Sequence, residues 1–138
     1  MTLKYPLLIV NLKTYLDNSR DAVKIAEIAR KISSETGANI ILTPSHLSLR
    51  EISKIVPTFA QSIDPIEHGA HTGHVLAHEV KNLGALGTLI NHSEKKISFE
   101  ELKKAIEICR QINLISCVCA HSEEDAERIA RLHPDIIL

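Results

Sequence analysis

Short apolar segments recur along the chain, and most of them are rich in β-branched residues. They lack the strict alternation of a half-exposed strand, so they favour strands that are covered on both faces. The predicted strands lie at residues 7–13, 39–44, 58–62, 87–93, 114–120 and 135–138. Such strands are typical of an α/β protein, in which helices cover a mostly parallel sheet.

Apolar residues at helical spacing separate several of these strands. The pattern predicts helices around residues 22–32 and 99–112. Two Ser-x-x-Glu spacings predict capping boxes at helix starts, Ser48 with Glu51 and Ser98 with Glu101. Gly37 follows the polar run "SSET" and predicts the end of the earlier helix.

The alternation of strands and helices predicts parallel strands joined by right-handed crossovers. Two architectures fit it, an open doubly wound sheet and a (β/α) barrel. No glycine-rich phosphate loop follows any predicted strand, which removes the best signal for the open nucleotide-binding sheet. No linker or low-complexity segment is present, so residues 1–138 are expected to form a single domain.

Polar residues end two of the predicted strands. Asn11 and Lys13 close the first, and His92 and Glu94 close the fourth; each pair is expected to share a face because side chains alternate along a strand. Taken singly, they suit a lysine that reaches solvent and a histidine satisfied within the fold. The carboxyl ends of parallel strands meet at one mouth, so together they predict a site for a small anionic ligand.

Three motifs carry a resemblance to a known family. "VNLKTY" at 10–15, "GAHTGHV" at 69–75 and "GTLINHSEKK" at 87–96 resemble the first-strand, third-loop and fourth-strand motifs of archaeal triosephosphate isomerase. The resemblance runs from residue 5 to the end of the chain. It implies a TIM (β/α)8 barrel that is incomplete here, with about six of the eight strand–helix units.

The resemblance also implies a function and residue roles. The family interconverts dihydroxyacetone phosphate and glyceraldehyde 3-phosphate through an enediolate, in glycolysis and gluconeogenesis and without a cofactor. His92 would be the uncharged electrophile that polarises the carbonyl, favoured by the helix predicted to begin at Ser98. Asn11 and Lys13 would bind the phosphorylated triose, with Lys13 offsetting negative charge, and Glu94 would be a catalytic-site partner of Lys13.

The family's catalytic base is a glutamate just beyond the sixth strand, and this sequence stops at Leu138, inside the apolar run "PDIIL". We therefore expect that the 138 residues alone do not isomerise triose phosphate at an enzyme-like rate. The alternative function is a catalytically inactive truncated barrel that acts only in subunit association. Unpaired strand edges predict that the isolated chain associates or is unusually soft.

Four histidines crowd the connection between the third and fourth predicted strands, namely His68, His71, His74 and His78. A metal site is one interpretation, because imidazole binds Zn, Ni and Cu. No cysteine or second cluster accompanies them, so an interface loop is favoured and no metal is expected. The resemblance places Thr72 near the tip of this loop, against a neighbouring subunit, in a homodimer or homotetramer.

Composition excludes several classes of partner. The 138 residues include 16 basic and 17 acidic side chains, a net charge of −1, which gives no basic surface for nucleic acid or membrane. There is no signal-peptide pattern and no membrane span. Three cysteines without paired spacing suggest a reducing, cytoplasmic location. Cys117 and Cys119 flank one residue and, like Cys109, are expected to be core residues.

Overall fold

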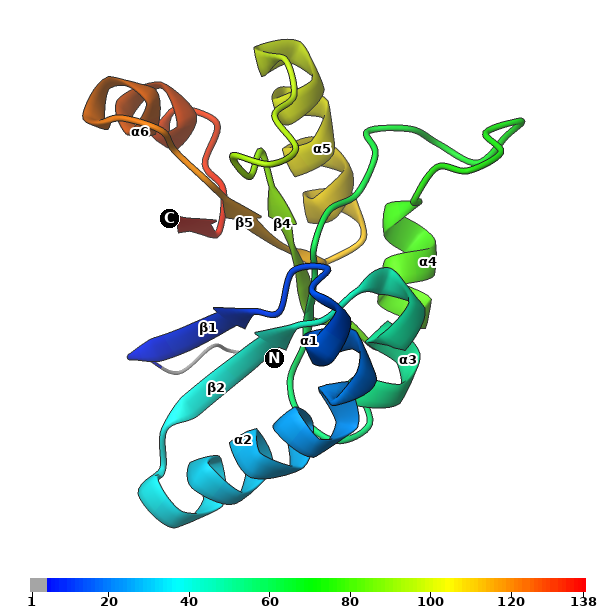
Figure 1. Cartoon of the computed structure of the whole chain (residues 1–138). Coiled ribbons are helices and arrows are strands. Elements are labelled where there is room, and N and C mark those ends of the chain that lie inside the picture. Colours follow the sequence, from blue (N-terminus) through cyan, green and yellow to red (C-terminus); the bar gives the residue numbers. More distant parts are fainter. Residues whose placement is uncertain (1–4) are drawn as a thin grey trace.

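The computed structural model describes residues 5–138, in which parallel strands alternate with helices (Figure 1). The strands are β1 (Leu7–Asn11), β2 (Asn39–Thr43), β3 (Phe59–Ala60), β4 (Gly87–Ile90), β5 (Ile115–Val118) and β6 (Ile136–Ile137). All six predicted strands are present, and each is shorter than predicted.

Every strand pairing is parallel, and the strands follow one another in chain order. β1 pairs with β2, and β3 to β6 form a second ladder. A single bridge between Leu42 and Thr58 connects the two. A doubly wound sheet reverses its strand order near the middle, whereas a barrel keeps its strands in sequence. The order therefore confirms the α/β fold class and a partial barrel.

The helices lie on the outer side of this curved sheet (Figure 1). They are α1 (Leu16–Arg20), α2 (Ala22–Thr36), α3 (Leu49–Ile52), α4 (Ala77–Asn82), α5 (Phe99–Gln111) and α6 (Glu123–Ala130), with a 3-10 turn η1 (His46–Ser48) before α3. The two helices predicted from periodicity are α2 and α5, while α1, α4 and α6 are additional. None of the helices within residues 5–138 is long and apolar enough to span a membrane.

One of the two predicted capping boxes is confirmed. Ser98 Oγ accepts the N–H of Glu101, and the Glu101 carboxylate accepts the N–H of Ser98 at 2.8 Å, so α5 begins as predicted. The box at Ser48 is wrong. Ser48 has helical backbone angles (φ −95°, ψ −7°) because it is the last residue of η1, and its side chain makes no capping hydrogen bond. Gly37 ends α2 with φ +74°, as predicted.

Apolar side chains fill both faces of the sheet. In β4, Leu89 belongs to an inner cluster with Phe59 and Cys117, whereas Ile90 packs outward against the helices. Beside the β1–β2 ladder, Ala26 and the other buried alanines of α2 pack against β1 and β2. Because alternate residues point to opposite faces, covering both faces requires apolar residues at successive positions. This explains the unbroken apolar runs of the sequence.

Candidate active site

The structure brings Lys13 and Glu94 into contact although 81 positions separate them along the chain. The Lys13 ammonium donates to Glu94 Oε1 at 2.9 Å, and His92 Nδ1 lies 3.6 Å from Glu94 Oε2. The three side chains gather where β1 and β4 end, at one rim of the sheet. The geometry thus assembles the three residues that the sequence nominated as catalytic, and their roles stay predictions.

The sequence predicted that alternation along each strand would place Asn11 with Lys13, and His92 with Glu94, on one face, and this was partly wrong. β1 ends at Asn11 and β4 ends at Ile90, so Lys13, His92 and Glu94 lie beyond the strands. Lys13 and Asn91 both have positive φ, +54° and +60°, so the chain turns sharply after each strand. Ile90, the last residue of β4, faces the outer core.

Hydrogen bonds to the backbone hold Lys13 in this unusual conformation. Asn11 Oδ1 accepts the N–H of Lys13 at 2.9 Å, and Gln61 Nε2 donates to its carbonyl oxygen at 2.7 Å. A non-glycine residue with positive φ is strained, and surrounding contacts have to stabilise it. Asn11 therefore positions Lys13, and Gln61 ties the same turn to the end of β3.

A second turn holds His92. Asn91 Nδ2 donates to the carbonyl of Cys119 at 3.1 Å, and Asn91 Oδ1 accepts the N–H of Ile97 at 3.2 Å. The Lys95 N–H closes the turn on the His92 carbonyl at 2.8 Å. Asn91 thus connects the end of β4 to β5 and to the segment that enters α5, which gives His92 a defined position.

The contacts of His92 indicate its tautomer. The N–H of Glu94 donates to His92 Nδ1 at 3.2 Å, which requires an unprotonated Nδ1. The 3.6 Å approach of the Glu94 carboxylate would be an ion pair only if Nδ1 carried a proton, and it exceeds hydrogen-bond distance. Nδ1 cannot do both, and the hydrogen bond has the better geometry. The hydrogen bond therefore selects the neutral tautomer whose proton is on Nε2.

Lys13 and Glu94 reinforce each other's charge. The hydrogen bond and the charge of Glu94 raise the pKa of Lys13, and the same contact with Lys13 lowers the pKa of Glu94. Both groups are therefore ionised around neutral pH. The side chains stay 36% and 58% exposed, so the ammonium is open to a ligand that approaches from the rim.

A cavity of about 440 Å³ lies beside these residues. It is lined by Asn11, Lys13, Thr14, Tyr15, His46, Gln61, Ser62, Val75, His92, Glu94 and Lys95. This volume lies within the usual range for small-molecule sites. The lining includes two ammonium groups, two imidazoles, two amides and a single carboxylate. It therefore offers mainly hydrogen-bond donors and suits a small anion.

Three lining residues were missed from the sequence. Gln61 follows β3 directly, so the strand-end reasoning that nominated Lys13 also applies to it. His46 lies just after β2, and its Nε2 donates to the Ser62 carbonyl at 2.8 Å. Lys95 stands one position after Glu94, within the motif at 87–96, and was not singled out from the sequence.

Lys95 fastens the start of the connection between β3 and α4. Its ammonium donates to Asp64 Oδ1 at 3.1 Å and to Ser62 Oγ at 3.2 Å. Asp64 also accepts the N–H of Val75 at 2.8 Å. Partial burial alone would raise the pKa of Asp64, but the Val75 N–H and Lys95 outweigh it and lower that pKa.

The middle of this connection projects from the body of the molecule, and Thr72 in it is exposed (Figure 1). The four histidines do not form one cluster. His68 packs beside His78 and His71 beside His74, with ring centroids 4.8 Å and 5.7 Å apart. The interface role of Thr72 stays a prediction.

The cysteines behave as core residues. Cys109 and Cys117 are buried, and burial raises the pKa of each thiol to about 12. Cys119 is half-buried, and burial raises its pKa as well. All three are free thiols, and the burial of Cys109 and Cys117 confirms the prediction of core cysteines for these two.

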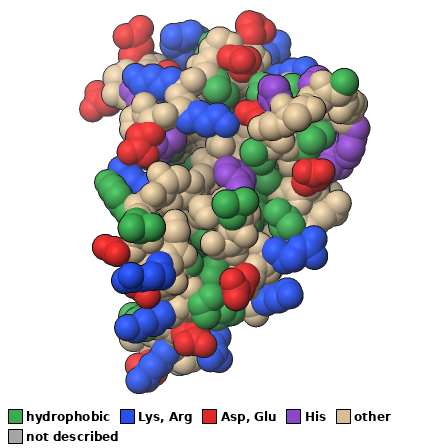
Figure 2. Space-filling model, turned by 45° about the vertical axis from the view of Figure 1, so that its right-hand side comes forward, with side chains coloured by type: hydrophobic (Ala, Val, Ile, Leu, Met, Phe, Trp, Pro, Cys, Tyr) green, Lys and Arg blue, Asp and Glu red, His purple; other side chains and the backbone are tan. Residues whose placement is uncertain are grey.

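On the face shown in Figure 2, basic and acidic side chains are interspersed.

Comparisons with known proteins identify relatives of this chain. A family model described as triosephosphate isomerase matches residues 6–137. The chain is 38% identical to the triosephosphate isomerase of Methanothermus fervidus over 135 residues, covering 96% of this chain and 61% of that protein. It is 40% identical to that of Methanocaldococcus jannaschii over 134 residues, with 95% and 61% covered.

The fold has a solved counterpart in the crystal structure of triosephosphate isomerase from Bartonella henselae. The TM-score is 0.69 at 14% identity, covering 95% of this chain and 61% of that one. The chain thus spans about three fifths of the length of the relatives that it matches. With the family model covering nearly all of its residues, the chain belongs to the triosephosphate isomerase family.

Proposed function

We propose that these residues form part of the active site of a triosephosphate isomerase, which interconverts dihydroxyacetone phosphate and glyceraldehyde 3-phosphate. The observation that carries the proposal is the contact of Lys13, Glu94 and His92 at the ends of β1 and β4 in a chain of this family. Residues 1–138 would constitute one partial barrel domain.

His92 is the electrophile in this proposal. With Nδ1 occupied by the Glu94 N–H, the proton of the neutral ring lies on Nε2. That N–H can donate to the substrate carbonyl oxygen and to the enediolate oxygen that replaces it. A donor held in place by the backbone needs little reorganisation when negative charge develops on that oxygen.

Lys13 supplies positive charge, and Glu94 keeps its ammonium protonated and directed toward the rim. The amide NH2 of Asn11 can donate to the substrate while its oxygen holds Lys13. Isomerisation moves one proton from the carbon beside the carbonyl to the carbonyl carbon, and a second proton passes from the hydroxyl oxygen to the former carbonyl oxygen, with the carbon-bound proton carried by the base. Lys13 and His92 would stabilise the enediolate between these steps, and a carboxylate base would carry the proton.

In the family that base is a glutamate beyond the sixth strand, and no residue of 1–138 follows β6 except Leu138. We therefore propose that the 138-residue chain binds an enediolate analogue and turns over substrate poorly. Titration with a phosphorylated enediolate analogue, followed by NMR, tests the binding. Transition-state analogues bind at least ~100-fold more tightly than substrates, so a site that lacks the base should still bind such an analogue measurably.

Binding should fall in His92→Gln and in Lys13→Met, and Lys103→Met on the surface of α5 is the matched control. Absence of analogue binding by the folded chain would count against the proposal. A coupled isomerase assay on the same sample tests the second part. Full turnover by the 138 residues would contradict the assignment of the base.

The second candidate function is subunit association without catalysis. It is supported by the exposed apolar side chains at the two edges of the described sheet, Leu8 in β1 and Ile137 in β6. Unpaired parallel edges pair readily with other strands. Association of the chain in sedimentation, together with a failure to bind the analogue, would favour this function.

Sedimentation also tests the quaternary structure. We propose a homodimer or homotetramer in the cytoplasm, with Thr72 and its loop against a neighbouring subunit. Thr72→Arg should shift the sedimenting species toward monomer, because a buried charge without a partner is costly. Lys24→Glu in α2, far along the chain from the loop, serves as the control.

A further inference from the structure

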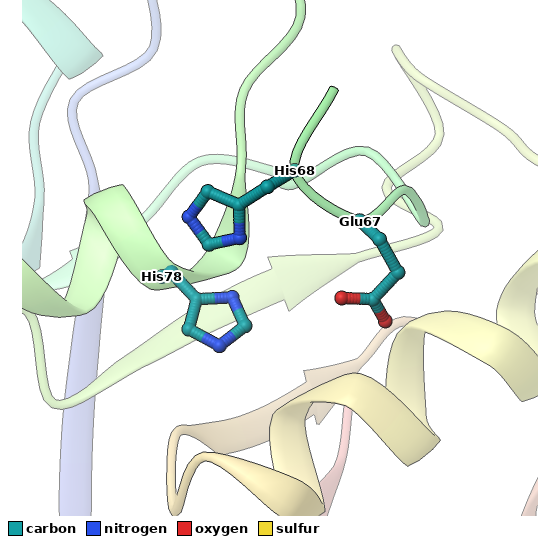
Figure 3. Close-up of side chains that lie close together, drawn as sticks. All are labelled: Glu67, His68 and His78. Carbon is teal, nitrogen blue, oxygen red and sulfur yellow. The ribbon is translucent and has the colours of Figure 1, made fainter.

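A carboxylate and two imidazoles meet at the base of the projecting loop. Glu67 and His68 come from the segment after β3, and His78 from the first turn of α4. One ligand-type atom of each lies within 4.8 Å of the others. Figure 3 shows both rings and the carboxylate turned toward a common space. None of the three lines the cavity at the rim.

His78 is the best evidence that this cluster binds something. Its Nδ1 is buried and has no hydrogen-bond partner within the described residues. Buried polar atoms of native proteins nearly always have partners, and leaving one without costs free energy. The rings of His68 and His78 are tilted by 53°, so the two imidazoles are not stacked face to face.

The donor set selects a class of ligand. Two imidazoles with one carboxylate are the three protein ligands of many zinc sites, in which water takes the fourth position. Mg²⁺ and Ca²⁺ prefer oxygen ligands throughout. Tetrahedral Zn²⁺ with bonds of about 2.0 Å places its ligand atoms about 3.3 Å apart. The ligand atoms here lie within 4.8 Å of one another, so binding an ion requires the exposed Glu67 and His68 to rotate inward.

We propose that Glu67, His68 and His78 bind a divalent transition-metal ion of the zinc class, which fastens the base of the loop that carries Thr72. From the sequence, the four loop histidines were weighed as a metal site and no metal was expected; the set proposed here differs from those four, since it adds Glu67 and omits His71 and His74. A metal that joins residue 68 to residue 78 closes a loop and lowers the entropy of its open conformations. The ion would therefore order the exposed tip.

Calorimetric titration of the metal-free full chain with ZnCl2 tests the site. The expected result is one ion per chain. His78→Ala and His68→Ala should each weaken binding by at least ~100-fold, since even a residue that only supports a ligand accounts for ~10–100-fold. Glu67→Gln should weaken it less. Its side chain is exposed, so this variant keeps the native fold even if His78→Ala does not.

Matched controls come from the same loop. His71→Ala and His74→Ala remove imidazoles outside the cluster and should leave zinc affinity unchanged. Co²⁺ in place of Zn²⁺ should give the intense visible bands of four-coordinate cobalt, and Mg²⁺ should not bind. Hydrogen exchange across residues 67–78 should slow on adding zinc to the wild type, but not to His78→Ala.

Two results would overturn the proposal. One is the absence of stoichiometric zinc binding by the folded wild-type chain. The other is binding that survives in Glu67→Gln and His68→Ala but is lost in His71→Ala or His74→Ala. Stoichiometric binding without slower exchange in the loop would refute the ordering of the tip. Neither of the first two results bears on Lys13 or His92, so the proposed isomerase function is tested separately.

Discussion

Replacing Gly87 by alanine tests the packing that holds β4, the strand that leads to His92. Gly87 is the first residue of β4 and pairs with Phe59 on one side and Ile115 on the other. A Cβ atom built on it would lie 2.6 Å from the carbonyl oxygen of Ile115, 2.7 Å from Phe59 Cε1 and 2.8 Å from Ile115 Cβ. All three distances are well below van der Waals contact.

The neighbours cannot move away cheaply. The Ile115 oxygen belongs to the backbone of β5, so shifting it disturbs the ladder between β4 and β5. The ring of Phe59 is fully buried at 0% exposure in the inner cluster. Overfilling a packed core typically costs about 1–3 kcal/mol. With one clash against backbone, we expect the upper end, about 3 kcal/mol, or roughly a 100-fold smaller folding constant.

Urea unfolding followed by circular dichroism measures this loss. With a slope of about 2 kcal/mol/M, the midpoint should fall by about 1.5 M. Gly37→Ala is the matched control. A Cβ there meets no atom within 4 Å, and only the φ of +74° opposes it, which costs about 1–2 kcal/mol. A Gly87→Ala midpoint no lower than that of Gly37→Ala would refute the reasoning.

Three further predictions concern the Lys13–Glu94 pair, the cap of α5 and the cysteines. Because Lys13 lowers the pKa of Glu94, the pair's contribution to stability is present above the ordinary value of 4.5 and is lost as pH falls through the lowered pKa. It is likewise present below 10.5 and is lost as pH rises through the raised pKa of Lys13. The stability difference between wild type and Glu94→Gln, measured in urea, should therefore shrink at both extremes; a difference independent of pH would argue against the pair. Ser98→Ala removes the cap of α5 and should destabilise the chain by about 1 kcal/mol in thermal unfolding, whereas an unchanged midpoint would mean that the cap is dispensable. Cys117, with a pKa of about 12, should react with a thiol reagent more slowly than Cys119, as peptide mass spectrometry can resolve, and the reverse order would contradict its burial.

Several features of this chain are readable from local sequence. The six strands, the helices α2 and α5 and their ends at Gly37 and Ser98 depend on the order of apolar residues and on backbone preferences over a few positions. The capping box at Ser48 failed although its spacing was right. A 3-10 turn already gave Ser48 helical angles, and spacing does not report backbone conformation.

The candidate site was likewise predicted in part from the sequence. Lys13, His92 and Glu94 could be nominated because polar residues at the ends of apolar strands meet at one rim in a parallel sheet. Their contact does not arise from strand alternation, since positive φ at Lys13 and Asn91 turns the chain after each strand. The amide of Asn91, which bridges β4 to β5 and α5, had no signal of its own in the sequence.

Periodicity and short motifs specify what each segment becomes, because those choices depend on neighbours a few residues away. Which side chains meet depends on how the segments pack. Packing brings Gln61 to the carbonyl of Lys13, Lys95 to Asp64, and Glu67 to His78. Each of these contacts involves at least one loop residue, and the path of a loop is set by the elements on either side and by backbone hydrogen bonds, which no periodic pattern encodes.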